Sequence, residues 1–121
     1  MSNILIVEDN LLNFELMETI LKHHGYAYLV AKGGESAVKI AQQEKLTLIL
    51  MDLQLPDMDG FTTLEEIRKI DNQKSVPAIA VTGNTTASDN VMAHEAGFEG
   101  LLAKPFRVHE LLDVLKRRVP F

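Results

Sequence analysis

Short apolar runs alternate along the chain with longer segments in which apolar residues recur every three or four positions. The short runs are rich in Val, Ile and Leu and predict β-strands, whereas the longer segments predict helices. The predicted strands lie at residues 4–7, 27–31, 46–51, 78–82 and 100–103. The predicted helices lie at residues 11–23, 34–44, 60–70, 86–96 and 107–118. The order of strand then helix occurs five times, which makes a (βα)5 chain.

The spacing of apolar residues within these elements predicts the fold class. In the last helix they follow the i, i+3, i+4, i+7 spacing of one buried face, at Val108, Leu111, Leu112, Leu115 and Val119. The first, third and fourth strands are apolar on both alternating faces, as strands are when helices cover both sides of a parallel sheet. We therefore predict an α/β fold with a doubly wound, parallel five-stranded sheet.

The composition is that of one globular domain, with 121 residues of which 46% are hydrophobic and 24% charged. The absence of cysteine excludes disulfides and thiolate metal sites. The opening "MSNILIVEDN" lacks the basic region and the long apolar run of a signal peptide, so we expect a cytoplasmic protein without a membrane partner. A net charge of -5 disfavours nucleic acid as a partner, because its phosphates attract basic surfaces.

Polar residues stand where four of the predicted strands end. Glu8 and Asp9 follow the first strand, Asp52 follows the third, Thr82 ends the fourth and Lys104 follows the fifth. A single acid after a strand is more often a helix cap than a ligand. The carboxyl ends of parallel strands lie at one edge of the sheet, where ligands bind. Three carboxylates, a hydroxyl and a lysine at that edge therefore indicate a functional site.

These residue types favour phosphoryl chemistry with a hard cation. Clustered carboxylates repel one another, and a set of oxygen ligands suits Mg2+, or Mn2+ in its place. An aspartate can attack a phosphoryl group and form an aspartyl-phosphate. Asp52 is the best candidate because it ends the most apolar strand. Lys104 and the Thr82 hydroxyl would then interact with the phosphoryl oxygens, and Gly83 would leave room for the group.

Four motifs spread over the chain resemble the receiver domain of two-component response regulators: "ILIVEDN", "LILMDLQLPDMDG", "AIAVTG" and "AKPF". The sequence looks most like stand-alone regulators of the cell-division type and like the receivers of hybrid kinases. The resemblance implies a flavodoxin-like sheet with strand order 2-1-3-4-5. It also implies a phosphorylation-activated switch that alters protein-protein binding and catalyses only its own phosphorylation and dephosphorylation.

The resemblance assigns a role to each site residue. Asp52 would accept a phosphoryl group from a histidine of a sensor kinase or of a histidine phosphotransfer protein. Mg2+ would be bound by Asp9, Asp52 and the backbone carbonyl of Gln54, with Glu8 acting through water. The phosphoryl group would be held by Thr82, Lys104 and the backbone of Leu53 and Gly83.

The resemblance also implies two partner surfaces. The kinase-facing surface would comprise Asn10, Leu11, Phe14, Pro105 and Phe106. The fourth helix, fifth strand and fifth helix would contact a downstream protein target. We expect a single receiver domain over residues 1–121 without an output domain, with a receiver fragment of a hybrid kinase as the alternative. We expect a monomer, and a phosphorylation-dependent dimer is the alternative.

Three positions bear on how such a switch would work. Leu101 stands three residues before Lys104, where the family usually has an aromatic residue that responds to the threonine. Gln54 and Asn84 stand two residues after Asp52 and Thr82, where side chains tune the loss of the phosphoryl group.

Three other functions fit this sequence less well. A Mg2+-dependent aspartyl-phosphate phosphatase would need a second aspartate two residues after the nucleophile, where this chain has Gln54. A flavodoxin-like nucleotide site would need a small, hydroxyl-rich loop in place of the acidic "VEDNLLN". An EF-hand calcium loop would need a carboxylate at its first position, which is Leu55. We instead interpret Asp59 as a helix cap and Asp57 as a turn residue.

Overall fold

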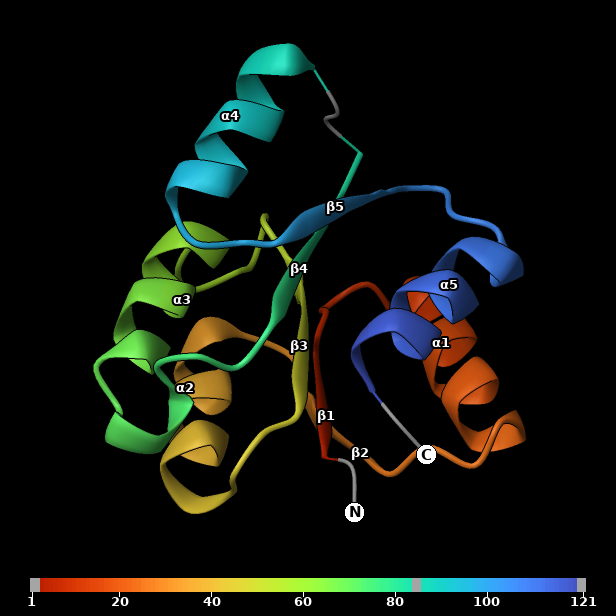
Figure 1. The fold of residues 1–121 in the computed structure, drawn as a ribbon, viewed down its shortest axis with the longest axis horizontal. Coiled ribbons are helices and arrows are strands. Elements are labelled where there is room, and N and C mark those ends of the chain that lie inside the picture. Colours follow the sequence, from red (N-terminus) through yellow and green to blue (C-terminus); the bar gives the residue numbers. More distant parts are fainter. Residues whose placement is uncertain (1–2, 84–85, 120–121) are drawn as a thin grey trace.

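The computed structural model describes residues 3–83 and 86–119 and contains one parallel five-stranded sheet. The strand order is β2-β1-β3-β4-β5, which confirms the order that the resemblance implies. Figure 1 shows the sheet edge-on between two layers of helices. The strands are β1 (Ile4–Val7), β2 (Tyr28–Ala31), β3 (Leu48–Asp52), β4 (Ala78–Thr82) and β5 (Gly100–Ala103).

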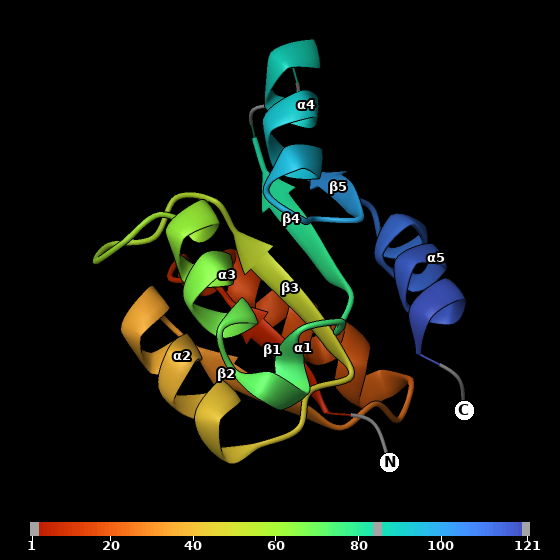
Figure 2. The same ribbon diagram turned by 60° about the vertical axis from the view of Figure 1, so that its left-hand side comes forward.

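The helices cover both faces of the sheet, as predicted. Helices α2, α3 and α4 lie on one face, and α1 and α5 lie on the other (Figures 1 and 2). Their bounds are α1 (Leu11–His23), α2 (Gly34–Gln43), α3 (Gly60–Arg68), α4 (Ala87–Glu95) and α5 (Val108–Arg118). A short 3-10 helix, η1 (Asp71–Gln73), was not predicted from the sequence. In the described part of the chain, no helix has the length and apolar character needed to cross a bilayer.

Two separate apolar clusters explain why the central strands are apolar on both faces. In β1, Leu5 and Val7 belong to the cluster that also contains residues of α2 and α3. Ile4 and Ile6, which alternate with them, belong to the cluster that contains residues of α1 and α5. Burial of both sets removes a large apolar surface from water, and this burial is the main stabilising contribution to the sheet.

Three helices begin with a side-chain cap of their own, and α2 does not. Asn10, Asp59 and Thr86 precede α1, α3 and α4, and each accepts a hydrogen bond from the backbone N–H three residues ahead. The helix-cap interpretation of Asp59 is thereby confirmed. Helix α2 follows Gly33, which has no side chain with which to cap it.

A buried glutamine ties η1 to the amino end of β3. The Gln73 side-chain amide nitrogen donates to the carbonyl oxygens of Ala41 at 2.8 Å and Glu44 at 2.6 Å. Its amide oxygen accepts from the N–H of Leu46 at 3.2 Å. Gln73 is fully buried, so these bonds satisfy a polar group that would otherwise be costly in the interior.

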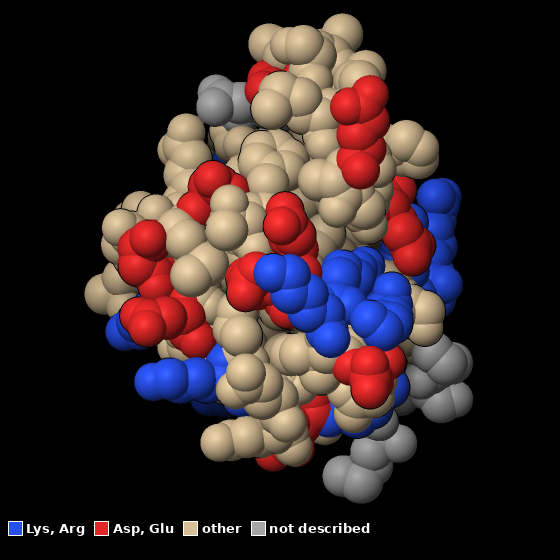
Figure 3. Space-filling view, turned by 90° about the vertical axis from the view of Figure 1, so that its left-hand side faces the viewer, with Lys and Arg blue, Asp and Glu red and all other residues tan. Residues whose placement is uncertain are grey.

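The surface over α2, α3 and α4 carries charges of both signs. Figure 3 shows basic side chains gathered beside acidic ones on this face. Glu66 of α3 and Lys69, the C-cap residue of this helix, form an ion pair with 2.7 Å between the charged atoms. The mixture agrees with the modest net charge of -5.

Candidate functional site

The strand register brings the predicted site residues to one edge of the sheet. Val7 of β1 pairs with Met51 of β3, so the next residues along each strand, Glu8 and Asp52, lie side by side. Thr82 of β4 pairs with Ala103 of β5, and the N–H of Lys104 donates to the Thr82 carbonyl at 2.8 Å. The four strand ends thus converge as the sequence predicted.

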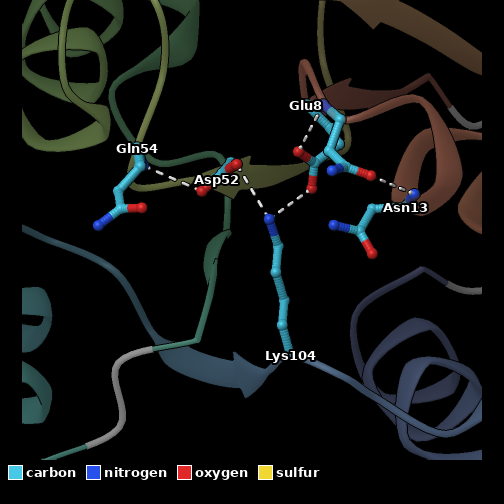
Figure 4. Close-up of polar contacts among 6 residues, drawn as sticks. Glu8, Asn13, Asp52, Gln54 and Lys104 are labelled. Atoms are coloured by element: carbon cyan, nitrogen blue, oxygen red, sulfur yellow. Dashed lines mark hydrogen bonds and ion pairs between the residues drawn. The ribbon is translucent and has the colours of Figure 1, made fainter.

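Lys104 bridges two carboxylates at the centre of this edge (Figure 4). Its ammonium nitrogen lies 2.9 Å from Oδ2 of Asp52 and 2.8 Å from Oε1 of Glu8. The second oxygen of each carboxylate is held by the chain that follows it. Asp52 Oδ1 accepts from the N–H of Gln54 at 2.9 Å, and Glu8 Oε2 accepts from the N–H of Asn10 at 3.1 Å. Both acids are therefore fixed in orientation.

Burial sets the electrostatics of this pair of acids. Glu8 is 1% exposed and Asp52 is 6% exposed. Burial raises the pKa of Glu8, and the adjacent Asp52 raises it further, although Lys104 opposes both effects. Burial alone would lower the pKa of Lys104, but its contacts with Glu8 and Asp52 outweigh burial and raise it. Lys104 is therefore a permanent cation at neutral pH.

The acids at this edge fit a hard metal ion. Glu8, Asp9 and Asp52 each offer a carboxylate oxygen within 4.8 Å of the others. Among the described residues, no other set of three His, Cys, Asp or Glu side chains is arranged in this way. Asp9 is exposed, so the site is open to solvent on that side. An all-oxygen ligand set of this kind suits a hard cation such as Mg2+ better than a softer metal.

The residues expected to contact a phosphoryl group surround Asp52. Thr82 is buried at the end of β4, next in the sheet to the strand that carries Asp52. A side chain at Gly83 would meet no protein atom within 4 Å, so packing does not require glycine there and the space beside it is open. Leu53 is buried directly after Asp52. Asn84 lies outside the described residues.

Asp57 has a role that the sequence did not reveal. Its carboxylate accepts hydrogen bonds from the N–H groups of Gly34 at 2.8 Å and Glu35 at 2.9 Å. It therefore caps α2, and the interpretation of Asp57 as a turn residue is incomplete. The partners are 22 and 23 positions away, so no local pattern links them. Because Asp57 and Asp59 both cap helices, their carboxylates are engaged as caps and not in a calcium loop.

The expected kinase-facing surface is partly exposed. Leu11 is 59% exposed. Leu12, which is not among the expected surface residues, is the most exposed large apolar residue of α1 at 78%. Asn10 and Pro105 are also exposed, while Phe14 is half-buried. Phe106 departs from the expectation: it is 7% exposed and belongs to the apolar cluster between the sheet and helices α1 and α5, so it supports this surface from below.

Leu101 stands where the resemblance implies an aromatic residue. It pairs with Ala80 in the sheet and is half-buried beside a cavity of about 160 Å³ between α4 and β5. Phe98 also lines that cavity, but its ring packs edge-on against Phe61 with ring centroids 6.1 Å apart. Phe98 is therefore held in the core on the side of α3.

Comparisons with known proteins agree on one family. The family model for the response regulator receiver domain matches residues 4–116. The chain is 31% identical to the polar-differentiation response regulator DivK of Brucella anthropi, covering 94% of this chain and 93% of that protein. It is 36% identical to the sensor protein GacS of Pseudomonas syringae pv. syringae, covering 93% of this chain but 13% of that protein.

Solved structures give the same result. The receiver domain of the sensor histidine kinase PA1611 from Pseudomonas aeruginosa PAO1, which has a magnesium ion coordinated in its active-site cleft, is 38% identical with a TM-score of 0.90. That match covers 99% of this chain and 98% of the other. A chain from the Saccharomyces cerevisiae complex of the phosphotransfer protein Ypd1 with the receiver domain of Ssk1 is 31% identical with a TM-score of 0.85, covering 99% and 94%.

Proposed function

The chain belongs to the response regulator receiver domain family, and on this premise we propose that Asp52 is the residue whose phosphorylation operates the switch. Members of this family are phosphorylation-activated signalling switches. One observation supports the assignment to Asp52 most strongly. Its buried carboxylate lies at the carboxyl end of β3, beside Glu8 and Asp9 and 2.9 Å from the ammonium group of Lys104.

The proposed reaction transfers a phosphoryl group from a phosphohistidine to Asp52. A carboxylate oxygen of Asp52 forms a bond to phosphorus, and the bond between phosphorus and the donor imidazole nitrogen breaks. The imidazole retains the electron pair of that bond. Lys104 offsets the negative charge on the phosphoryl oxygens, and the Thr82 hydroxyl donates to one of them. The backbone N–H groups of Leu53 and Gly83 are further donors.

A divalent cation fits the remaining charge at this site. We assign Mg2+ to Asp9, Asp52 and the backbone carbonyl of Gln54, with Glu8 acting through water. When bound, Mg2+ neutralises the carboxylates and the phosphoryl oxygens. The acids that would hold it have oxygens within 4.8 Å of one another, and a similar receiver domain contains magnesium in its active-site cleft.

The proposed phosphodonor is a histidine kinase or a histidine phosphotransfer protein. Its docking surface would include Asn10, Leu11, Phe14 and Pro105, which lie around the carboxyl end of the sheet. The complex of a similar receiver domain with the phosphotransfer protein Ypd1 supports this class of partner. The surface of α4, β5 and α5 would contact the downstream protein, with half-buried Leu101 beneath it.

Intact-mass analysis tests the proposal directly. With MgCl2 and acetyl phosphate as a small phosphodonor, the wild type should gain one phosphoryl group, and Asp52→Asn should gain none. Equal labelling of the two proteins would contradict the assignment of Asp52. The same samples distinguish a switch from a phosphatase, because a phosphatase would release phosphate steadily, whereas a switch would hold one equivalent and lose it slowly.

A further inference from the structure

The first turn of α2 is capped by a residue from a different part of the chain. Gly33 stands at the N-cap position without a side chain, and the first free N–H groups of the helix point to the carboxylate of Asp57. Hydrogen bonds from Glu35 and Gly34 lower the pKa of Asp57, so it is charged at neutral pH and suits the positive end of the helix dipole. Figure 2 shows α2 and α3 side by side, with the loop between β3 and α3 at their upper ends.

Both ends of this loop, residues 53–59, lie close to Asp52. At its start, the N–H of Gln54 donates to Oδ1 of Asp52 at 2.9 Å. At its end, the N–H of Gly60 donates to the Leu53 carbonyl at 3.0 Å, and a Cβ on Gly60 would lie 2.7 Å from the Asp52 carbonyl oxygen. Asp57 fixes the part of the loop between these two points to α2.

Two glycines at the start of α2, the N-cap Gly33 and the first helical residue Gly34, allow the loop to approach this closely. A Cβ on Gly33 would lie 2.8 Å from Oδ1 of Asp57, and a Cβ on Gly34 would overlap Met58 and Thr63. Side chains at either position would push the loop away from the helix. The close contact therefore depends on the Asp57 carboxylate of the loop and on the absence of side chains at Gly33 and Gly34 of the helix start.

We infer that Asp57 is a positioning residue: by holding loop 53–59 on the amino end of α2, it fixes the backbone of Gln54 and so sets the affinity of the site for Mg2+. The inference rests on the proposed function, in which the Gln54 carbonyl binds the metal. If a metal ligand lies on a loosely held loop, part of the binding free energy is spent on ordering that loop. Removing a group that orients a metal ligand therefore commonly weakens metal binding.

The first test measures Mg2+ binding without any phosphodonor. MgCl2 is titrated into the nitrogen-15-labelled protein, and the dissociation constant is obtained from the shift of the Gln54 amide resonance. Asp57→Ala should raise this constant on the order of tenfold, and Asp57→Asn, which keeps one acceptor oxygen, should raise it less. The concentration of MgCl2 giving half-maximal labelling by acetyl phosphate should rise in parallel.

Two controls separate positioning from helix stability. In the double variant Gly33→Ser with Asp57→Ala, the serine caps α2 locally, because residue 33 has an extended backbone and the clash with Asp57 is gone. Its melting temperature should recover, but its Mg2+ affinity should stay weak. Asp59→Ala removes a carboxylate from the same loop that bonds only its own helix, at 2.7 Å from the Thr62 nitrogen, and should lower the melting temperature without weakening Mg2+ binding.

The inference is overturned if Asp57→Ala and Asp57→Asn bind Mg2+ like the wild type. It is also overturned if Gly33→Ser restores Mg2+ affinity together with stability, since Asp57 would then act only through α2. Failure of the proposed function gives a different result: Mg2+ binding would respond to Asp57 as described, while acetyl phosphate would not label Asp52.

Discussion

Lys104 and Asp52 are 52 positions apart in the sequence, yet the ammonium nitrogen of Lys104 lies 2.9 Å from Oδ2 of Asp52. The same nitrogen lies 2.8 Å from Oε1 of Glu8, so one cation serves two buried acids. Two carboxylates in a desolvated site would repel each other strongly without it. Lys104 therefore contributes to the stability of the fold as well as to the proposed phosphoryl site.

Replacing Lys104 with methionine should destabilise the protein. The change keeps an unbranched apolar side chain of similar length but leaves Glu8 and Asp52 buried without a cation. Removal of one member of a buried ion pair is costly, although the 17% exposure of the lysine side chain allows some screening by water. We expect a loss of roughly 2 kcal/mol in the free energy of unfolding at pH 7, measured by urea denaturation.

Lys69→Met is the matched control for this variant. Lys69 forms an ion pair of 2.7 Å with Glu66, but its side chain is 65% exposed, so its removal should change the free energy of unfolding much less than the removal of Lys104. MgCl2 should stabilise Lys104→Met more than the wild type, because a bound cation would replace the missing charge. Equal stability losses in the two variants would show that burial of the Lys104 pair has no energetic consequence.

Asp57 should make stability depend on pH in acid. Its pKa in the folded protein is lowered from the ordinary value of 3.8 by backbone hydrogen bonds from Glu35 and Gly34. The folded protein thus binds this proton less readily than the unfolded chain, and the charged form stabilises the fold above pH 3.8. That contribution is lost as the pH falls below 3.8 through the lowered pKa.

Urea denaturation of the wild type and Asp57→Asn over a pH series measures this effect. The wild type should be the more stable protein near neutral pH, and the two should converge in acid, where protonated aspartate resembles asparagine. A constant difference at every pH would mean that the charge of Asp57 does not contribute to the cap.

Gln73→Leu should destabilise the protein without affecting the site. The leucine leaves the carbonyls of Ala41 and Glu44 and the N–H of Leu46 without their buried partner. We expect a loss of roughly 3 kcal/mol in the free energy of unfolding. Asn72→Leu, at an exposed neighbour in η1, should change stability little. Labelling of Asp52 should be normal in both, because Gln73 lies at the opposite end of β3; loss of labelling in folded Gln73→Leu would contradict this separation.

Leu101→Phe should be tolerated better than Leu102→Phe. Leu101 is half-buried beside the cavity of about 160 Å³ between α4 and β5, which can accept part of the ring. Leu102 is 4% exposed in the cluster under α1 and α5, where added volume forces neighbours to shift. We expect a loss under about 1 kcal/mol for the first and about 2 kcal/mol for the second. Equal melting temperatures for the two variants would show that the cavity beside Leu101 does not accommodate the phenylalanine ring.

Most of the secondary structure could be predicted because each strand or helix has a characteristic pattern of apolar residues within a short segment. The central strands are uniformly apolar, and α5 carries its apolar stripe at helical spacing, so the ends of the elements differ from the prediction by at most two residues. The 3-10 helix η1 was missed because a segment of three residues is too short to have a period. The strand order followed from the resemblance and not from the pattern.

The candidate site could be predicted because its residues share one topological property. Glu8, Asp9, Asp52 and Lys104 all follow strands, and Thr82 ends one; parallel strands place these ends on one edge. The prediction could not include how deeply each side chain is buried or which charged groups form ion pairs. It did not foresee that Lys104 bridges Glu8 and Asp52, or that Phe106 is inside.

Local sequence is enough to predict where strands and helices form, which of their faces are apolar and which polar groups follow the strands, because these properties depend on neighbours within a few positions. The packed fold sets which distant groups come into contact: Asp57 with the start of α2, Gln73 with the chain before β3, and Lys104 with Glu8 and Asp52. Such contacts depend on register and on the close approach of backbones at Gly33, Gly34 and Gly60, and these arise only when the whole core is packed.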